Sequence, residues 1–171
     1  MRTLTIAAAA AAAFAATPAL AQDATAFSGG HIEAIAGLDS IHGGGDSETG
    51  IAFGIAGGYD IRKSNAVFGI ELEAADSSIS DSGVSASRDL YAGLRVGVVV
   101  ADHTLLYAKG GYTNARASFA GTGVNFDGLR AGAGLEWAVG QHFSIRGEYR
   151  YSNYEDGLSR HQGIMGLSYR F

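Results

Sequence analysis

Apolar and polar residues alternate with a period of two along most of the chain. In the segment RGEYRY, Arg146, Glu148 and Arg150 alternate with a glycine and two tyrosines. Successive side chains of a β-strand point to opposite faces, so this pattern places the charges on one face and the rings on the other. A helix would scatter the same charges around its circumference. The pattern therefore predicts β-strands.

Eight segments show this alternation, at residues 29–41, 50–60, 66–75, 88–100, 104–114, 126–139, 142–152 and 162–171. The connections after the second, fourth and sixth segments are short, and those after the first, third, fifth and seventh are longer and polar. This layout is typical of outer-membrane barrels. The predicted fold class is all-β, an eight-stranded antiparallel up-and-down transmembrane β-barrel. The eighth strand must pair with the first, because an open sheet edge does not persist in hydrocarbon.

A soluble barrel would turn its apolar face inward, but two features favour the opposite arrangement. Bulky charges on the polar faces alternate with glycine, as in Gly93, Arg95 and Gly97, which indicates a crowded interior. Aromatic residues of the apolar faces lie near the predicted strand ends, as in the girdles at the two interfaces of a bilayer. The predicted girdle residues are Phe53, Tyr59, Phe68, Tyr112, Trp137, Phe143, Tyr151, Tyr169 and Phe171.

The start of the chain has the pattern of a secretory signal peptide. A basic Arg2 precedes an alanine-rich apolar run, and Ala19 and Ala21 form an A-x-A cleavage site. We therefore predict a signal peptide over residues 1–21 and one barrel domain over residues 22–171. The longest later apolar run, at 96–101, is too short for a membrane helix. These features predict export to the outer membrane of a bacterium.

Composition narrows the function classes further. The chain has 17 acidic residues against 12 Lys and Arg, so it lacks the basic character of a nucleic-acid-binding protein. It has no cysteine, so disulfide bonds cannot stabilise it. Its 26 glycines are interspersed with apolar residues rather than with serine and proline, which indicates an ordered chain.

The charged residues on the predicted inner face are the main candidate site. An eight-stranded barrel encloses about enough room for its own side chains, whereas open channels appear at about 16 strands. Buried charges are costly unless they are paired, so we expect a structural network of salt bridges that plugs the lumen. A gated pore for small solutes is the alternative. The predicted lumen network comprises Glu33, Glu71, Glu73, Asp89, Arg95, Lys109, Arg130, Glu136, Arg146, Glu148, Arg150 and Arg170.

Two cross-strand pairs follow from the expected turns. A turn centred on Gln141 would place Glu136 opposite Arg146 on the lumen face. A turn around Asp102 would place Arg95 opposite Lys109. These two cations would then need Glu71 and Glu73 as shared counter-ions.

Candidates for catalysis and metal binding are weak. A lipid A-modifying enzyme would need an outward Ser or His constellation near the outer leaflet. His103 and His142 belong to the short-turn end, and His42 and His161 are expected in or beside loops without an adjacent outward Ser and carboxylate. The loop acids, Asp46 with Glu48 and Glu155 with Asp156, could contact divalent ions that bridge lipopolysaccharide, but ordinary solubilising charges are favoured. No catalytic residue, metal ligand or cofactor is therefore predicted.

Several stretches resemble a known family. LLYAKGGY (105–112), RAGAGLEWAV (130–139), FSIRGEYRY (143–151) and the terminal GLSYRF are similar to the opacity-protein and OmpA-like small barrels often labelled porin family. The resemblance implies that Tyr169 and Phe171 form a signal read by the barrel-assembly machinery. No C-terminal peptidoglycan-binding domain is expected after Phe171, so no envelope tether of that kind is implied.

The expected function is a structural or surface-interaction role in the bacterial envelope. The alternatives are a narrow porin-like channel for small solutes and, third, a lipid A-modifying enzyme. Expected partners are outer-membrane lipid and lipopolysaccharide, the barrel-assembly machinery during biogenesis, and an extracellular ligand bound through the loops.

Overall fold

The computed structural model describes residues 26–43, 46–78, 80–81, 84–119, 122–154 and 159–171. The predicted signal peptide and its cleavage site at Ala19 and Ala21 lie outside these ranges. The strands are β1 (Gly29–Gly43), β2 (Asp46–Lys63), β3 (Ala66–Ser77), β4 (Ser80–Asp81), β5 (Val84–Ala101), β6 (Thr104–Phe119), β7 (Thr122–Ala138), β8 (Phe143–Tyr154) and β9 (Ser159–Arg170).

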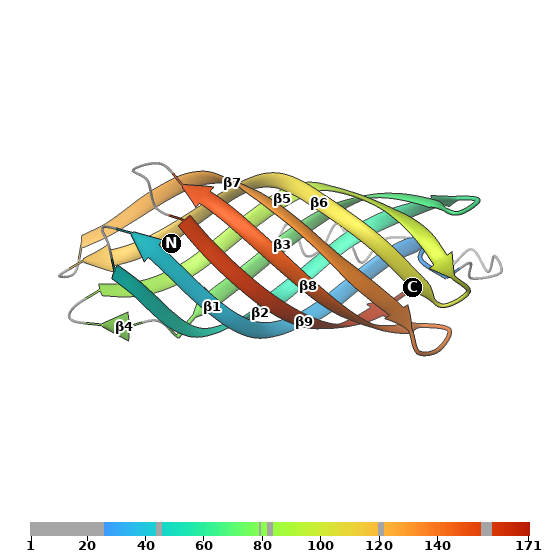
Figure 1. Cartoon of the computed structure of the whole chain (residues 1–171), viewed down its shortest axis with the longest axis horizontal. Helices are drawn as coiled ribbons and strands as arrows, with labels where there is room; N and C mark the ends of the chain where they lie inside the picture. The colour runs from blue at the N-terminus through green and yellow to red at the C-terminus, as the bar shows by residue number, and fades with distance from the viewer. Residues whose placement is uncertain (1–25, 44–45, 79, 82–83, 120–121, 155–158) are drawn as a thin grey trace, which may run out of the picture.

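Eight long strands form a closed antiparallel barrel, and the two-residue β4 pairs with β5 at one end (Figure 1). Each long strand pairs with its neighbours along the chain, with β3 next to β5. The barrel closes through β1 and β9, from His31 opposite Arg170 to His42 opposite Ser159. Closure gives hydrogen-bond partners to the backbone N–H and C=O groups that an open sheet edge would expose to lipid. The predicted fold class and the pairing of the last strand with the first are confirmed.

No helix within the described ranges is long and apolar enough to cross a membrane.

The strands are longer than predicted at the end that carries the polar connections, here called the long-loop end. β1 and β2 stay paired up to Gly43 opposite Asp46, and β6 and β7 up to Phe119 opposite Thr122. The predicted strand ranges 29–41, 50–60, 104–114 and 126–139 are therefore too short at this end. An antiparallel ladder needs only backbone partners, so it continues through glycine and polar residues whose composition resembles that of a loop.

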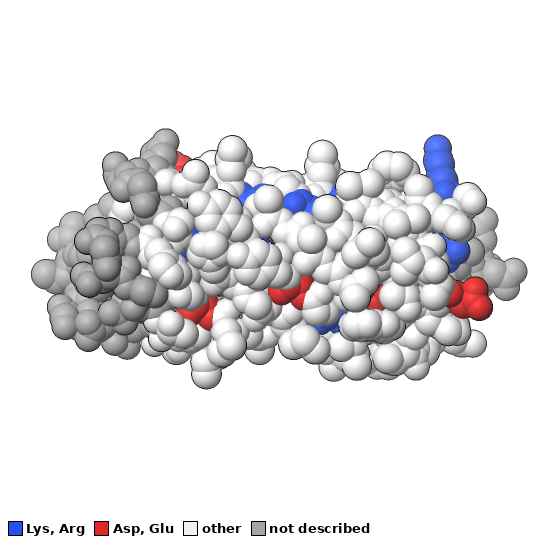
Figure 2. All heavy atoms as spheres, in the orientation of Figure 1, with Lys and Arg blue, Asp and Glu red and all other residues white. Residues whose placement is uncertain are grey.

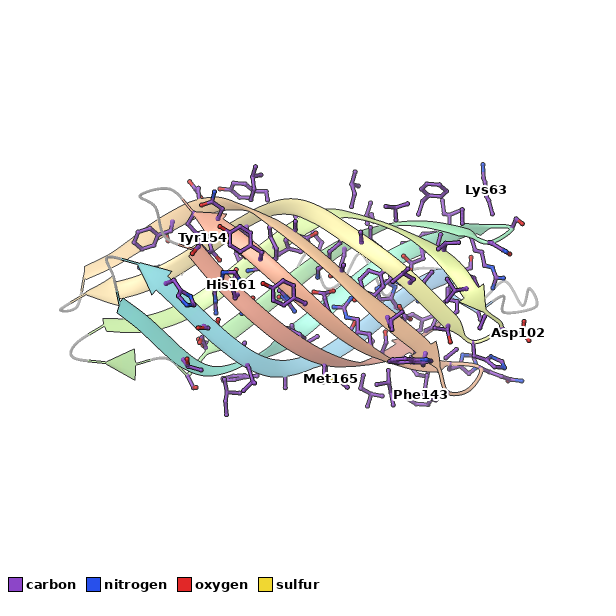
Figure 3. All side chains as sticks on the ribbon, in the orientation of Figure 1. Lys63, Asp102, Phe143, Tyr154, His161 and Met165 are labelled. Carbon is purple, nitrogen blue, oxygen red and sulfur yellow. The ribbon has the colours of Figure 1, made fainter. Side chains whose placement is uncertain are left out.

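The two faces of the wall have the predicted inverted polarity. On β8 the burial alternates strictly from Ser144 to Tyr154 apart from Gly147, with the odd-numbered side chains facing outward. The surface in Figure 2 is largely uncharged between its two ends. Lys63 and Asp102 lie at the short-turn end, which also holds the C-terminus (Figures 1 and 3). The apolar face therefore meets lipid and the polar face lines the lumen.

Candidate functional site

The candidate site is the lumen, where charged side chains from every long strand meet. All twelve predicted lumen residues are buried. Three further charged residues, Asp39, Asp60 and Arg160, are buried with them. Among the described residues the interior therefore holds eight acidic and seven Lys or Arg side chains. The charges are nearly balanced, so most of them can pair with one another.

The first group of charges lies toward the short-turn end. The Arg95 Nη2 atom lies 2.6 Å from Glu136 Oε2 and 3.4 Å from Asp60 Oδ2. Arg170 contacts the same two acids, at 3.1 Å from Asp60 and 3.2 Å from Glu136. The Ser144 hydroxyl donates to Glu136 at 2.7 Å. Two guanidinium groups therefore share two carboxylates.

The second group occupies the middle of the barrel around Glu71. The Lys109 Nζ atom lies 2.6 Å from Glu71 Oε1 and 2.9 Å from Glu148 Oε1. Arg146 donates to Glu71 Oε2 at 2.7 Å, and its Nε atom lies 2.6 Å from Glu33. Each carboxylate oxygen of Glu71 thus binds a different cation, which fixes both side chains across the lumen.

The third group leads to the long-loop end. Arg150 and Arg130 both bind Glu73, and Arg130 also binds Asp89. Arg160 then contacts two acids from other strands. Its Nη1 atom lies 2.9 Å from Asp89 Oδ2, and its Nε atom donates to Asp39 Oδ1 at 2.7 Å. The ion pairs therefore continue toward the long-loop end of the barrel.

The expected cross-strand positions are confirmed, but the ion pairs differ from the simplest expectation. Glu136 faces Arg146 in the β7–β8 register, and Arg95 faces Lys109 in the β5–β6 register. Glu71 is a counter-ion of Lys109 as expected, with Glu73 farther away at 3.7 Å. Arg95 uses neither of these acids and binds Asp60 and Glu136 instead.

Glycines on the inner face make room for these long side chains. A Cβ added to Gly166 would lie 1.5 Å from Glu33 Oε1, and one added to Gly93 would lie 2.1 Å from the Tyr91 hydroxyl. At Gly111 a Cβ would lie 2.2 Å from the backbone oxygen of Ala92. The interior is therefore packed to the limit that these glycines set.

An apolar cluster lies at the short-turn end of the lumen. Phe27, which precedes β1, is 1% exposed and packs with Val67, Val99, Leu105 and Tyr107. A hydrogen bond of 3.0 Å from the Arg62 guanidinium to the Ala26 carbonyl holds this segment. Gly29 has a φ of 104°, a left-handed conformation that glycine adopts without strain as the chain enters β1. Residues before the first strand therefore take part in filling the barrel.

The nine predicted girdle residues all lie on the outer face, between 37% and 62% exposed. At the short-turn end, the Tyr169 ring lies 5.2 Å from the Phe143 ring and 5.3 Å from the Phe171 ring. The backbone amide of Phe171 donates to the Gly30 carbonyl at 3.0 Å. The roles of these residues as girdles and of Tyr169 and Phe171 as an assembly signal stay predictions.

Two histidines expected in or beside loops lie in strands, near the ends that adjoin the polar connections. His42 lies in β1 and His161 in β9, because both strands continue past the predicted ends. His161 faces outward, opposite Ser40 in the β1–β9 register. The Tyr149 hydroxyl lies 2.6 Å from His161 Nδ1. The loop acids Asp46, Glu48, Glu155 and Asp156 have no described side chains.

Sequence reasoning missed four residues of the interior. Asp39 and Asp60 have the inward parity of their strands, so the alternation already contained the signal for them. Arg160 was assigned to a loop, and only extending the last strand by three residues brings it into the pattern. Phe27 precedes the first strand, and no periodicity indicated that it lies in the lumen.

The sequence matches the outer membrane protein β-barrel domain family over residues 6–171. The chain belongs to this family. Family membership and the closed barrel place the protein in the bacterial outer membrane, as expected. A comparison with curated proteins finds no match.

Solved structures with this fold include barrels of similar size. Neisserial surface protein A matches with a TM-score of 0.65 and 17% identity, covering 84% of this chain and 98% of that chain. The attachment invasion locus protein Ail of Yersinia pestis matches with a TM-score of 0.61 and 17% identity, covering 84% and 99%. The N-terminal barrel of Pseudomonas aeruginosa OprF matches with a TM-score of 0.52 and 11% identity, covering 82% and 97%. The predicted small outer-membrane barrel is thus confirmed.

Proposed function

We propose that this protein has a structural and surface-interaction role in the bacterial envelope, with a lumen plugged by its own charged side chains. The observation that carries the proposal is the linked set of ion pairs across the lumen. Glu71 joins Lys109 to Arg146, and Asp89 joins Arg130 to Arg160. A permeating ion would have to separate several of these linked, buried ion pairs at once.

The Phe27 cluster supports the same proposal. It places an apolar layer at the short-turn end, and the centroid of its Tyr107 ring lies 4.6 Å from the guanidinium carbon of Arg95, which binds Asp60 and Glu136. Ions cross an apolar constriction poorly because it offers them no hydrogen bonds. A solute that passed the ion pairs would therefore meet a second barrier of different chemistry.

The surface role rests on the fold and on the relatives. A rigid barrel that carries connections at its long-loop end is a scaffold for extracellular contacts. The names of two relatives, Neisserial surface protein A and the attachment invasion locus protein, denote a surface location and attachment. We propose outer-membrane lipid, lipopolysaccharide and an extracellular ligand as partners of this chain, and the barrel-assembly machinery during biogenesis.

A non-catalytic role is part of the proposal. Ser40 and His161 face each other on the outer surface, as a serine hydrolase would require. However, the Nδ1 atom of His161 is engaged by the Tyr149 hydroxyl rather than by a carboxylate. Within the described ranges, the group that orients a catalytic histidine is thus replaced by a neutral phenol.

Single-channel recording in planar bilayers tests the plugged lumen. We expect no steady conductance from the wild type, and none from Phe27→Ala, because the ion pairs remain when the apolar layer is opened. A steady wild-type conductance that changes when Lys109 or Arg95 is neutralised would contradict the plugged lumen and support the narrow porin-like channel.

Two measurements on cells test the envelope role. Deletion is expected to reduce envelope integrity or host-cell contact. Mass spectrometry of lipid A from cells that express the protein is expected to show unchanged species. New lipid A masses that disappear in a Ser40→Ala variant would overturn the non-catalytic role and identify an enzyme.

A further inference from the structure

Four ring side chains form an outward-facing patch near the long-loop end of the barrel. This patch, called the His161 patch, consists of Tyr149 and Tyr151 on β8, His161 on β9 and His42 on β1. The neighbours of His161 along β9, Arg160 and Gln162, are buried in the lumen, so the imidazole faces outward. Figure 3 shows His161 toward the long-loop end, with Met165 farther along β9 toward the short-turn end.

His161 is the centre of the patch. Its Nδ1 atom lies 2.6 Å from the Tyr149 hydroxyl. Its ring centroid lies 4.9 Å from that of Tyr151 and 5.4 Å from that of His42, the latter in an edge-on arrangement. These contacts from both neighbouring strands hold the imidazole in one orientation at the surface.

The hydrogen bond to Tyr149 decides what the other ring nitrogen of His161 presents. A neutral imidazole that accepts the phenol proton at Nδ1 carries its own proton at Nε2. A protonated imidazole carries a proton at both nitrogens. In both of these states Nε2 is a hydrogen-bond donor, and the positive form adds a charge to it. The remaining tautomer, whose Nδ1–H group donates to the phenol oxygen, would leave Nε2 an acceptor. We take the phenol as the donor because it is the more acidic group, so the pair presents a donor suited to an anion.

Open space above a glycine, here called the notch at Gly163, lies beside this donor. Gly163 follows two residues after His161 on the same face, and a Cβ added there would meet nothing within 4 Å. Tyr149 and Leu38 are its register partners on either side, and Met165 follows it on β9. Leu38 and Met165 are 68% and 59% exposed, respectively. A polar donor therefore adjoins a notch of the kind that a lipid chain can fill.

The surroundings favour an anion over a cation. On the outer faces of β1, β8 and β9, no described side chain is acidic. The titratable side chains that face His161 are the phenols of Tyr149 and Tyr151 and the imidazole of His42. Among the described side chains of these three strands, no carboxylate competes for the donor or repels an anionic headgroup.

We propose that the His161 patch binds the phosphate group of a lipid in the outer leaflet. The His161 Nε2–H group donates to a phosphate oxygen, Tyr149 fixes the tautomer, and an acyl chain occupies the notch at Gly163. Phosphate oxygens are strong acceptors, and a hydrogen bond at the edge of the hydrocarbon competes little with water. The lipid is thus held by residues of the outer face, and this contact does not depend on whether the lumen conducts.

Native mass spectrometry of the refolded full chain in detergent micelles tests this proposal. The probes are dioleoyl phosphatidic acid and dioleoylglycerol, which share their acyl chains and differ in the phosphate. We expect the wild type to bind the phosphatidic acid preferentially. His161→Phe is expected to weaken this binding about tenfold, the loss typical of one hydrogen bond to a charged group.

Two further variants sharpen the test. Tyr149→Phe keeps the ring and removes only the hydroxyl, so a smaller loss of phosphatidic acid binding is expected. His103→Phe makes the same exchange as His161→Phe in the β5–β6 turn at the opposite end, and it is expected to bind like the wild type. The slower gel migration on heating that barrels show identifies folded protein for every variant. If His161→Phe does not fold, Tyr149→Phe and His161→Gln carry the comparison.

Four results would overturn the proposal. The first is binding of dioleoylglycerol equal to that of phosphatidic acid. The second is unchanged binding of phosphatidic acid by folded His161→Phe and Tyr149→Phe. The third is displacement of the lipid by an equal concentration of inorganic phosphate, which would assign the site to a soluble anion. The fourth is a dimer of the wild type that His161→Phe abolishes without a change in lipid binding, which would assign the patch to a second copy of the chain.

Discussion

Glu136 and Arg146 lie directly opposite each other on β7 and β8, yet their charged groups bind different partners. Glu136 accepts from Arg95 and Arg170, whereas Arg146 reaches across the lumen to Glu71 and Glu33. Adjacent backbone positions therefore do not determine the pairing of long side chains. In a closed barrel a flexible side chain can select a carboxylate from the opposite wall, where it completes more than one contact.

Glu71 is one of the acids that two cations share, so its removal should destabilise the barrel. Glu71→Ala leaves Lys109 and Arg146 each without one carboxylate contact in the interior. We expect the free energy of unfolding to fall by about 3–5 kcal/mol, the usual cost of breaking a buried pair. Urea unfolding in lipid vesicles measures this change. Asp102→Ala, in the exposed turn after β5, is expected to change it by about 0.5 kcal/mol or less. Equal effects of the two substitutions would contradict the buried network.

The position of the membrane along the outer face can be tested on one strand. Leu94 and Val100 both face outward on β5, with exposures of 68% and 56%. Leu94 lies in the middle of the strand and Val100 near its end at the short turn. We expect Leu94→Arg to destabilise the folded barrel by about 2–4 kcal/mol and Val100→Arg by about 0–1 kcal/mol. Folding titrations in vesicles provide the measurement, and a larger loss for Val100→Arg would place the membrane elsewhere on the barrel.

Two adjacent glycines of β6 lie on opposite faces of the wall, Gly111 on the inner face and Gly110 on the outer face. A Cβ on Gly111 would lie 2.2 Å from the Ala92 backbone oxygen, whereas one on Gly110 would meet only the Arg130 oxygen at 3.8 Å. Gly111→Ala is therefore expected to cost about 1–3 kcal/mol through overpacking. Gly110→Ala should be neutral or stabilising by up to about 1 kcal/mol, because alanine loses less backbone freedom on folding. Thermal unfolding of both variants compares them, and similar shifts in Tm would argue against a crowded lumen.

The predicted signal-peptide cleavage site determines the expected mass of the mature protein. Cleavage after Ala21 would leave Gln22 as the first residue. Intact-mass measurement of the protein from outer-membrane fractions is expected to correspond to residues 22–171. An Ala21→Leu variant is expected to retain the first residues, since the cleavage site requires a small side chain. A wild-type mass that includes residues 1–21 would show that this segment stays attached.

The choice of the face that meets lipid came from the inner glycines and the aromatic residues near the strand ends, whereas the strands and their two faces came from one signal, the period of two. That signal placed all twelve predicted charges in the lumen and nine aromatic residues on the outer face. It did not find the strand ends at the long-loop side, because the ladders between β1 and β2 and between β1 and β9 continue through residues typical of loops. Arg160 and the outward position of His161 were missed for this reason.

Alternation along the chain determined the strands and their number, and the glycines among the inner charges together with the aromatic residues near the strand ends determined the inverted polarity of the wall. These properties depend on the direction of each side chain relative to its own backbone, which the sequence order specifies. Only the tertiary structure decided which acid binds which base, and that Phe27 packs in the lumen beneath Tyr107. Those contacts join strands that are distant in sequence, and they depend on the stagger of the closed sheet and on side-chain reach, which no local pattern records.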